Sequence, residues 1–292
     1  ARVLAANGIR AYLFDAPRPT PELSFALRHL HAKAGINVTA SHNPSIYNGY
    51  KAYWEDGAQI SPEQADVVSA AIEKVDIFTG VKLVSFEEGK KAGLIQIIGQ
   101  EVDEAYMKVV LAERIRPNAI PDVADDFKVV YTPFHGTGRI LVPEVLKRAG
   151  LKHLYCVPEQ MVPDGRFPTV KSPNPEDKAG FALAMKIAEE NGCDLLIGTD
   201  PDADRAGVIV RASNGEFVPL TGNQIGVMLL SYIIEARKLE NKLPANAAAV
   251  KSIVSTKLAD KICEANSVTM INVLTGFKFI GEKIKEFEET GS

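Results

Sequence analysis

The hydrophobic positions of the chain fall into two alternating patterns, which is typical of an α/β protein. Short apolar runs such as Lys128–Thr132 and Leu195–Ile197 predict buried strands. Between such runs, segments including 177–191 and 221–238 carry apolar residues at the spacing of one helix face. We therefore predict an α/β fold of three successive modules, with mainly parallel mixed sheets sandwiched by helices and an active site at the cleft between the modules.

Module boundaries are predicted where this pattern breaks. The segment 116–122 contains two prolines and interrupts the helical periodicity. We place the modules at 1–116, 117–215 and 216–292, and the first helix of the third module near Thr221. Residues 1–7 are typical of the end of a helix, and no strand follows the last helix near Gly291. Both ends are therefore expected to lie inside a larger fold.

In the first module the pattern predicts a βαβ unit. A strand at Ile9–Phe14 precedes an amphipathic helix over 21–33, with Thr20 as the N-cap, and a second strand follows at Ile36–Thr39. We expect both strands in one mainly parallel sheet joined by a right-handed crossover. Tyr50–Trp54 is predicted to return as a strand toward the same edge.

Composition and charge exclude several classes of protein. The chain has 292 residues, of which 46% are hydrophobic and 24% charged, and a formal net charge of −4. This composition is that of a soluble globular protein and gives no reason to expect nucleic acid or a membrane as partner. No apolar run approaches the ~20 residues needed to span a bilayer, and no signal peptide is visible.

The cysteines indicate a reducing compartment. Cys156, Cys193 and Cys263 are odd in number and lie in apolar or small-residue settings. We expect buried free thiols without a chemical role and a cytoplasmic location.

The acidic loop after the strand at 193–198 predicts a metal site. Asp200, Asp202 and Asp204 alternate there, and the carboxyl ends of parallel strands are where ligands bind in open α/β sheets. Three carboxylates so close together repel unless a cation lies among them, and Mg²⁺ is the usual hard cation with oxygen ligands. A calcium-binding EF-hand loop is excluded, because Arg205 and Arg211 stand where that loop needs glycine and glutamate.

A second candidate site follows the strand at 36–39. Ser41 and His42 lie in a tight loop there, because Pro44 keeps Asn43 out of the helical region. The loop lacks the Gly-x-Ser-x-Gly elbow of hydrolases. Lys51, carried by the returning strand, is expected to act as an acid or base with a lowered pKa.

A phosphate on Ser41 would connect the two sites. A phosphoserine oxygen would complete the coordination of a Mg²⁺ held by Asp200, Asp202 and Asp204. The metal would polarise the phosphorus for attack by a substrate hydroxyl, and Arg205 would stabilise charge on the transferring group.

Taken together, these stretches resemble the α-D-phosphohexomutase superfamily and are most similar to its bacterial phosphoglucomutase branch. The resemblance covers essentially the whole chain. It rests on the following segments: Thr39–Pro44, Ser45–Tyr47, Asn48–Lys51, Gly198–Arg205 and Thr275–Gly281.

The resemblance implies a phosphoserine enzyme that interconverts glucose 1-phosphate and glucose 6-phosphate. Ser41 would be the phosphorylated serine and a ligand of Mg²⁺ together with the three aspartates. His42 and Lys51 would assist proton transfer, and Arg205 would lie beside the phosphoryl group. A bisphosphorylated sugar would be the intermediate, and glucose 1,6-bisphosphate the activator.

The resemblance also implies a sugar-contacting loop in the third module, with Thr275, Gly276 and Lys278 as its binding residues. Family features expected outside this sequence include a Gly- and Arg-containing N-terminal loop, a Glu-containing sugar loop and a fourth domain. The chain by itself is therefore expected to be weakly active or inactive as a mutase.

Three alternatives stay open at this point. Phosphomannomutase or phosphopentomutase activity would use the same catalytic residues. A Mg²⁺-dependent phosphatase would transfer the phosphate from Ser41 to water. A non-catalytic phosphosugar-binding module would keep the fold but would not need Ser41.

Overall fold

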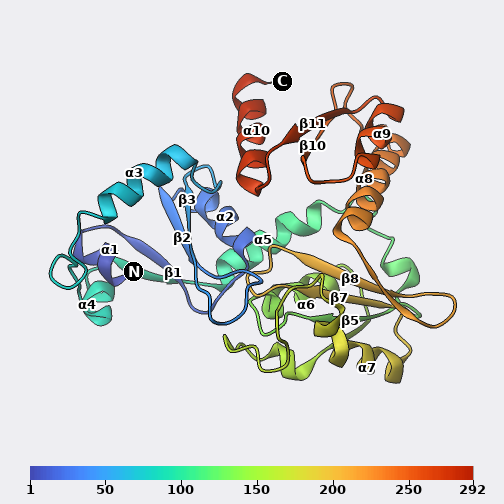
Figure 1. Cartoon of the computed structure of the whole chain (residues 1–292), viewed down its shortest axis with the longest axis horizontal. Coiled ribbons are helices and arrows are strands. Elements are labelled where there is room, and N and C mark those ends of the chain that lie inside the picture. The colour runs from blue at the N-terminus through green and yellow to red at the C-terminus, as the bar shows by residue number, and fades with distance from the viewer. Residues whose placement is uncertain (292) are drawn as a thin grey trace.

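The structure is a computed structural model that describes residues 1–291. It contains three α/β modules that follow one another along the chain (Figure 1). The first module is drawn in blue to teal, the second in green to yellow and the third in orange to red. The α/β class and the mixed sheets predicted from the sequence are confirmed.

The first module holds two separate two-stranded sheets. Strand β1 pairs in parallel with β4, and β2 pairs antiparallel with β3. Its elements are α1 (Arg2–Ala6), β1 (Ala11–Phe14), α2 (Thr20–His29), β2 (Ala34–Val38), β3 (Tyr50–Trp54), α3 (Pro62–Ile72), α4 (Phe86–Lys91), β4 (Ile95–Ile98) and α5 (Gln100–Ala112). The β2–β3 pairing confirms the predicted return of the strand at 50–54.

The predicted βαβ unit is wrong in three respects. Strands β1 and β2 do not pair with each other, so α2 connects two different sheets. The helix also ends at His29, four residues earlier than expected, because His31 takes a positive φ of 50° and turns the chain into β2. Its N-cap is Pro19, which leaves the Thr20 side chain free for another partner.

The second module is built on a five-stranded sheet in the order β6-β5-β7-β8-β9. The first three strands in that order are parallel, and β8 and β9 continue the sheet as antiparallel strands. Its elements are a 3₁₀ turn (Pro121–Val123), β5 (Lys128–Thr132), α6 (Gly138–Arg148), β6 (His153–Cys156), 3₁₀ turns (Pro158–Met161 and Lys178–Phe181), α7 (Ala182–Asn191), β7 (Leu195–Thr199), β8 (Ala206–Arg211) and β9 (Phe217–Leu220).

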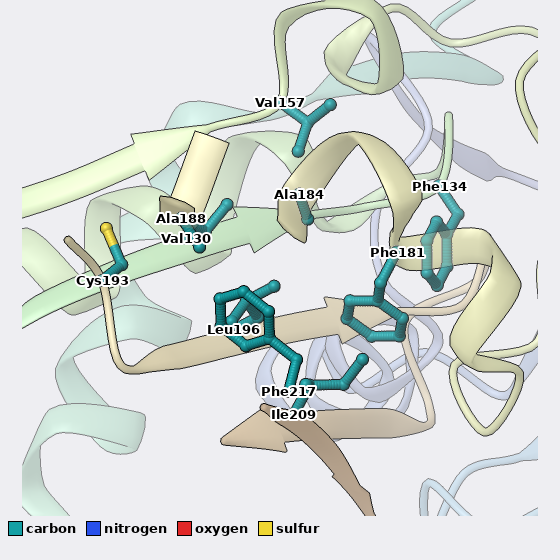
Figure 2. Packing of buried hydrophobic residues seen from close by; sticks show 10 residues of the cluster. All are labelled: Val130, Phe134, Val157, Phe181, Ala184, Ala188, Cys193, Leu196, Ile209 and Phe217. Atoms are coloured by element: carbon teal, nitrogen blue, oxygen red, sulfur yellow. The ribbon is translucent and has the colours of Figure 1, made fainter. Parts of the chain in front are cut away.

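The central strands of this sheet carry the largest of the three clusters of buried hydrophobic residues found among residues 1–291. Val130 of β5 and Leu196 of β7 are fully buried beneath α7, where Phe181 meets Phe134 edge to face at 5.1 Å between ring centroids. Figure 2 shows these side chains converging with those of the neighbouring elements. The cluster comprises Val130, Phe134, Val157, Phe181, Ala184, Ala188, Cys193, Leu196, Ile209 and Phe217. Because the core fixes β5 and β7, it also fixes the loops that leave their carboxyl ends.

The third module has a parallel pair of strands flanked by helices. Its elements are α8 (Gly222–Leu239), β10 (Ala248–Ser252), α9 (Leu258–Ala265), β11 (Thr269–Val273) and α10 (Phe277–Thr290). Thr221 caps α8 in a reciprocal capping box with Gln224. Since β9 is hydrogen-bonded to β8, the strand at 217–220 belongs to the second sheet. The boundary at 215–216 stays a prediction.

No helix among residues 1–291 is long and apolar enough to cross a membrane. All three cysteines are free, as predicted; Cys193 and Cys263 are buried, whereas Cys156 is half-buried.

A buried glutamate makes the first module sensitive to pH. Glu22 in α2 has no exposed surface, and neither of its carboxyl oxygens receives a hydrogen bond. The nearby Arg18 guanidinium forms ion pairs with Asp103, at 2.8 Å between Nε and Oδ1, and with Asp15. Burial, followed by the hydrogen bond and charge of Asp103, raises the pKa of Glu22 to about 8. Glu22 is therefore protonated at neutral pH and can donate to Asp103.

We predict that the free energy of unfolding falls as the pH rises. The pKa of Glu22 in the folded state lies above its ordinary value of 4.5. The stability that Glu22 contributes to the folded state is therefore complete below pH 4.5 and is lost as the pH rises through about 8. The loss amounts to a few kcal/mol at most, since one pKa unit corresponds to about 1.4 kcal/mol. Urea unfolding between about pH 5 and about pH 9 should show a flatter profile for Glu22→Gln. The exposed first-turn control Glu87→Gln should follow the wild type, and a wild-type slope in Glu22→Gln would contradict the assignment.

Candidate active site

The two loops singled out in the sequence meet in the structure. Ser41 follows β2 and Asp200 follows β7, and the Ser41 hydroxyl donates a hydrogen bond to the Asp200 carboxylate at 3.0 Å between oxygens. Ser41 has a positive φ of 53°, and its backbone N–H donates to the Thr39 hydroxyl at 2.8 Å. A non-glycine residue in this region is strained, and such strain concentrates at functional sites. The serine is therefore held in an uncommon conformation that points it at the acidic loop.

Asp200, Asp202 and Asp204 form a cluster that fits a cation. Their ligand oxygens lie within 4.8 Å of one another. Asp200 is fully buried and Asp202 is 3% exposed, while Asp204 faces solvent. One buried oxygen of Asp202 has no hydrogen-bond partner. A buried carboxylate oxygen without a donor is what a cation would satisfy, and an all-oxygen ligand set suits Mg²⁺.

Burial and neighbouring charges change the pKa values of Asp200 and Asp202. Burial, followed by the charges of Asp202 and Asp204, raises the pKa of Asp200 to about 7. Burial also acts to raise the pKa of Asp202, but the hydrogen bond and charge of Lys51 outweigh it, so the pKa of Asp202 lies below its ordinary value. The cluster therefore holds less than its full negative charge unless a cation binds.

Lys51 joins the cluster, but not with the predicted pKa. Its ammonium group lies 2.9 Å from Asp202 Oδ2 and 3.2 Å from Asp204 Oδ2. Burial alone would lower the pKa of Lys51, but the hydrogen bond and charge of Asp202 and the charge of Asp204 raise it. The expectation of a lowered pKa is wrong, because β3 carries Lys51 onto two carboxylates. Lys51 is a cation and a proton donor in this arrangement.

His42 lies beside the serine hydroxyl. Its Nδ1 is 3.3 Å from Ser41 Oγ. Burial, followed by the positive charge of Arg205, lowers the pKa of His42. The imidazole is therefore neutral near pH 7 and can accept the serine proton.

Arg205 lies at the open edge of the cluster. Its backbone N–H donates to Asp200 Oδ1 at 3.1 Å, and its guanidinium Nε is 4.0 Å from Asp204 Oδ1. The side chain is 49% exposed and therefore available to an anion bound at this edge.

Thr20 and Asn37 complete the site, and sequence reasoning missed both. The Thr20 backbone N–H donates to the Asp202 carbonyl at 2.8 Å, and its hydroxyl lies 3.3 Å from Asp202 Oδ2. The Asn37 amide donates to the Thr20 hydroxyl at 2.6 Å. The sequence pattern identifies Thr20 only as a helix cap, and a polar residue within a strand, Asn37, was the available signal. Together they orient the buried Asp202 carboxylate from the side of the first module.

Close backbone packing braces the two loops. The turn after β5 lies against the acidic loop, where the Thr137 N–H donates to the Pro201 carbonyl at 2.8 Å. A Cβ at Gly136 would lie 2.3 Å from Pro201 Cα, so only glycine fits there. On the serine side, the Ser172 hydroxyl donates to the His42 carbonyl at 3.3 Å. The second module therefore holds both the acidic loop and the serine loop.

The third-module residues predicted to bind substrate lie apart from these contacts. Thr275 and Gly276 form an exposed bend before α10, and Lys278 lies in the first turn of that helix. Within residues 1–291, no hydrogen bond or ion pair connects Thr275, Gly276 or Lys278 to Ser41 or the aspartates. Their predicted role stays a prediction.

Sequence models of three phosphoglucomutase/phosphomannomutase α/β/α domains match the chain in order. Domain I matches residues 1–77, domain II 104–215 and domain III 221–291. The chain belongs to the phosphoglucomutase/phosphomannomutase family. Phosphoglucomutase of Staphylococcus epidermidis is 41% identical to this family member over 285 residues, which are 98% of this chain and 50% of that protein. The chain thus spans about half the length of the curated relatives it matches.

Solved structures share the fold of this phosphoglucomutase/phosphomannomutase family chain. A Thermus thermophilus protein assigned as a phosphomannomutase superimposes with a TM-score of 0.73 at 25% identity, covering 98% of this chain and 60% of that one. N-acetylphosphoglucosamine mutase of Aspergillus fumigatus, crystallised with GlcNAc-6P and magnesium, gives a TM-score of 0.50 at 16% identity over 89% of this chain and 60% of that one. The second likeness is one of fold.

We predict that Thr20→Val weakens divalent-cation binding. Valine keeps the shape but loses the hydroxyl that orients Asp202, and a hydrogen bond of this kind contributes about 1 kcal/mol, or about fivefold in affinity. Calorimetric titration with Mn²⁺ measures the effect directly. Thr20→Ser retains the hydroxyl and should bind as the wild type does. Equal affinities for the valine variant and the wild type would show that Thr20 does not orient the carboxylate.

Gly136→Ala should destabilise the second module. The added methyl group would displace the Pro201 backbone, and overpacking of this kind costs about 1–3 kcal/mol. Thermal unfolding should report the loss, and Mn²⁺ affinity should fall with it because Pro201 lies between two of the aspartates. Gly165→Ala is the matched control, because a Cβ there meets nothing within 4 Å. A wild-type melting temperature for Gly136→Ala would contradict this reading of the loop contact.

Proposed function

We propose that this chain carries the phosphoserine and metal-binding part of a phosphohexomutase that interconverts glucose 1-phosphate and glucose 6-phosphate. The observation that carries the proposal is the 3.0 Å hydrogen bond from Ser41 to Asp200, a member of the buried aspartate cluster. The 41% identity to a phosphoglucomutase supports glucose phosphates as substrates in preference to mannose or pentose phosphates.

The first step loads the serine. Ser41 Oγ attacks a phosphorus atom of glucose 1,6-bisphosphate, a new bond forms between Oγ and phosphorus, and the bond from phosphorus to the sugar oxygen breaks. The Ser41 proton passes to His42 Nδ1, which lies 3.3 Å away. The departing sugar oxygen takes a proton from the Lys51 ammonium group, whose raised pKa keeps it charged.

The second step runs the same chemistry in reverse. A hydroxyl of a hexose monophosphate attacks the phosphoserine and transfers its proton to Lys51, while His42 returns a proton to Ser41 Oγ. The bisphosphate that forms reorients and repeats the first step at its other phosphate. Both protons return to their starting positions, so the cycle balances.

The charged residues set the electrostatics of the transfer. Asp200, Asp202 and Asp204 would hold Mg²⁺, which supplies positive charge to the phosphoryl oxygens when bound. Arg205 would pair with the same oxygens from the open edge. Magnesium is present in the structure of the A. fumigatus relative, in keeping with this ligand set.

We predict that incubation with glucose 1,6-bisphosphate and Mg²⁺ adds one phosphoryl group, at Ser41. Intact-mass and peptide mass spectrometry would locate it. Ser41→Ala should take up none, and Asp202→Ala should react at least about a hundredfold more slowly, the size typical for loss of an electrostatic contact to the transition state.

Two further results decide between functions. Ser69→Ala, at an exposed position of α3 away from the serine loop and the aspartates, is the matched control and should still be phosphorylated. Release of inorganic phosphate from the phosphoprotein as fast as transfer to glucose 6-phosphate would favour a phosphatase. Phosphorylation at a residue other than Ser41 would contradict the proposal.

A further inference from the structure

A proline-rich segment carries Thr20 to the aspartate cluster. Residues 15–21 connect β1 to α2 and contain three prolines, at positions 17, 19 and 21. Because proline has no N–H group, this segment has few backbone donors. Within residues 1–291, no backbone N–H of residues 16–19 donates a hydrogen bond to another backbone group. Side-chain contacts are therefore needed to hold the segment that precedes Thr20.

Arg18 makes these contacts. Its side chain is 5% exposed, and its Nε and Nη2 donate to the two carboxyl oxygens of Asp103 at 2.8 and 2.9 Å. Nη2 also donates to Asp15 Oδ1 at 3.0 Å, and Nη1 donates to the Ala16 carbonyl at 3.1 Å. A pair of parallel hydrogen bonds to one carboxylate fixes the orientation of a guanidinium group as well as its position. Since Asp103 lies in the first turn of α5, Arg18 fastens the segment to that helix.

Glu22, in the first turn of α2, faces the same ion pair. From α5 it is faced by Asp103 and Tyr106, and from the segment before α2 by Arg18, which also pairs with Asp15. Strand β2, on which α2 packs, has no titratable residue. Among these groups of the described chain, Arg18 is the only cation, and each of its nitrogens already donates a hydrogen bond.

Ionisation of Glu22 would disturb this arrangement. With a pKa of about 8, its carboxyl group holds a proton at neutral pH and loses it as the pH rises further. The loss places a second buried negative charge against Asp103, which is costly without a free donor. The cost falls if Arg18 turns from Asp103 to Glu22, or if Glu22 turns toward solvent. Either movement displaces the N-terminal turn of α2.

The displaced turn also contains Thr20, two residues before Glu22. The Thr20 N–H donates to the Asp202 carbonyl at 2.8 Å, and the Thr20 hydroxyl lies 3.3 Å from Asp202 Oδ2. A shift of this turn therefore acts on the acidic loop of the second module.

We propose that Arg18, Asp103 and protonated Glu22 are positioning residues that hold Thr20 against Asp202 and thereby set the affinity of the aspartate cluster for its cation. The inference rests on the proposed function in one respect, namely that the three aspartates bind Mg²⁺. The three positioning residues act through Thr20. The cluster binds its cation more tightly while Glu22 is protonated than after it has lost the proton.

Calorimetric titration with Mg²⁺ at about pH 7 and about pH 9, on either side of the pKa of Glu22, tests the proposal. The quantity to compare is the ratio of the wild-type dissociation constant to that of Glu22→Gln at the same pH, because effects of pH on the aspartates are common to both proteins. Glutamine keeps a neutral side chain that can donate to Asp103. We expect a ratio near one at the lower pH and of about five at the higher pH, the contribution of one hydrogen bond.

A Thr20→Val background separates positioning from a general effect on stability. If Glu22 acts through Thr20, the advantage of Glu22→Gln at the higher pH disappears in this background. A general loss of folded structure would act in both backgrounds alike. The exposed control Glu87→Gln should follow the wild type at both pH values. An equal ratio at the two pH values, or an advantage that persists with Thr20→Val, would overturn the proposal.

Hydrogen exchange at Thr20 provides a second readout that needs no metal. Thr20 lies between Pro19 and Pro21, so its amide is the only one at positions 19–21 and can be followed alone. Arg18→Lys keeps the charge but loses the paired hydrogen bonds, and it should speed exchange of this amide by about fivefold or more. Arg10→Lys, at an exposed position before β1, is the matched control and should exchange as the wild type does.

The two readouts distinguish failure of this inference from failure of the proposed function. If the wild type binds no Mg²⁺ at either pH, the metal site of the proposed function is wrong, and with it the inferred effect on cation affinity. If Mg²⁺ binds but Arg18→Lys leaves exchange at Thr20 unchanged, the positioning by Arg18 is wrong and the metal site stands. Phosphorylation of Ser41 enters neither measurement.

Discussion

The mutual repulsion of three neighbouring carboxylates is the constraint on which the site depends. Asp200, Asp202 and Asp204 place their oxygens within 4.8 Å of one another, and two of the three are buried. Isolated buried charges are costly, so the surrounding structure must supply positive charge, hydrogen bonds or protonation. All three are present: Lys51 pairs with Asp202, Thr20 donates to it, and burial holds the pKa of Asp200 near 7. A bound cation could replace the positive charge of Lys51, the hydrogen bond from Thr20 and the proton on Asp200. The cluster is therefore suited to bind a cation.

This compensation comes largely from a different module from the aspartates themselves. Lys51 and Thr20 belong to the first module, whereas the acidic loop belongs to the second. Compensation of the aspartate charges in the second module therefore depends on side chains of the first module. The same contact between the modules brings Ser41 to Asp200. Because the serine and the cluster are held by shared hydrogen bonds, their separation is fixed without a continuous sheet between the modules.

Features that depend on the local sequence pattern could be predicted from the sequence. Features that depend on which distant strands pair with each other could not. Ser41 and Asp200 could be placed together, because each follows an apolar strand and ligands gather at the carboxyl ends of such strands. The pairing of β1 with β4 could not be predicted, because the sequence pattern gave no strand at Ile95–Ile98. The predicted direction of the Lys51 pKa shift was wrong for a related reason: the register of β3 places the ammonium group beside two carboxylates. Thr20 was visible only as a helix cap, and its contact with Asp202 spans 182 residues.

The division of the first module into two small sheets bears on how the serine is positioned. Within residues 1–291, strand β2, which precedes Ser41, is paired only with β3, so its sheet contributes little rigidity by itself. Contacts from the second module supply what the sheet lacks: Asp200 accepts from the Ser41 hydroxyl, and Ser172 donates to the carbonyl of His42. The position of the Ser41 side chain therefore depends on the pairing of β2 with β3 and on the electrostatics of the aspartate cluster. Both interactions act on residues 39–42.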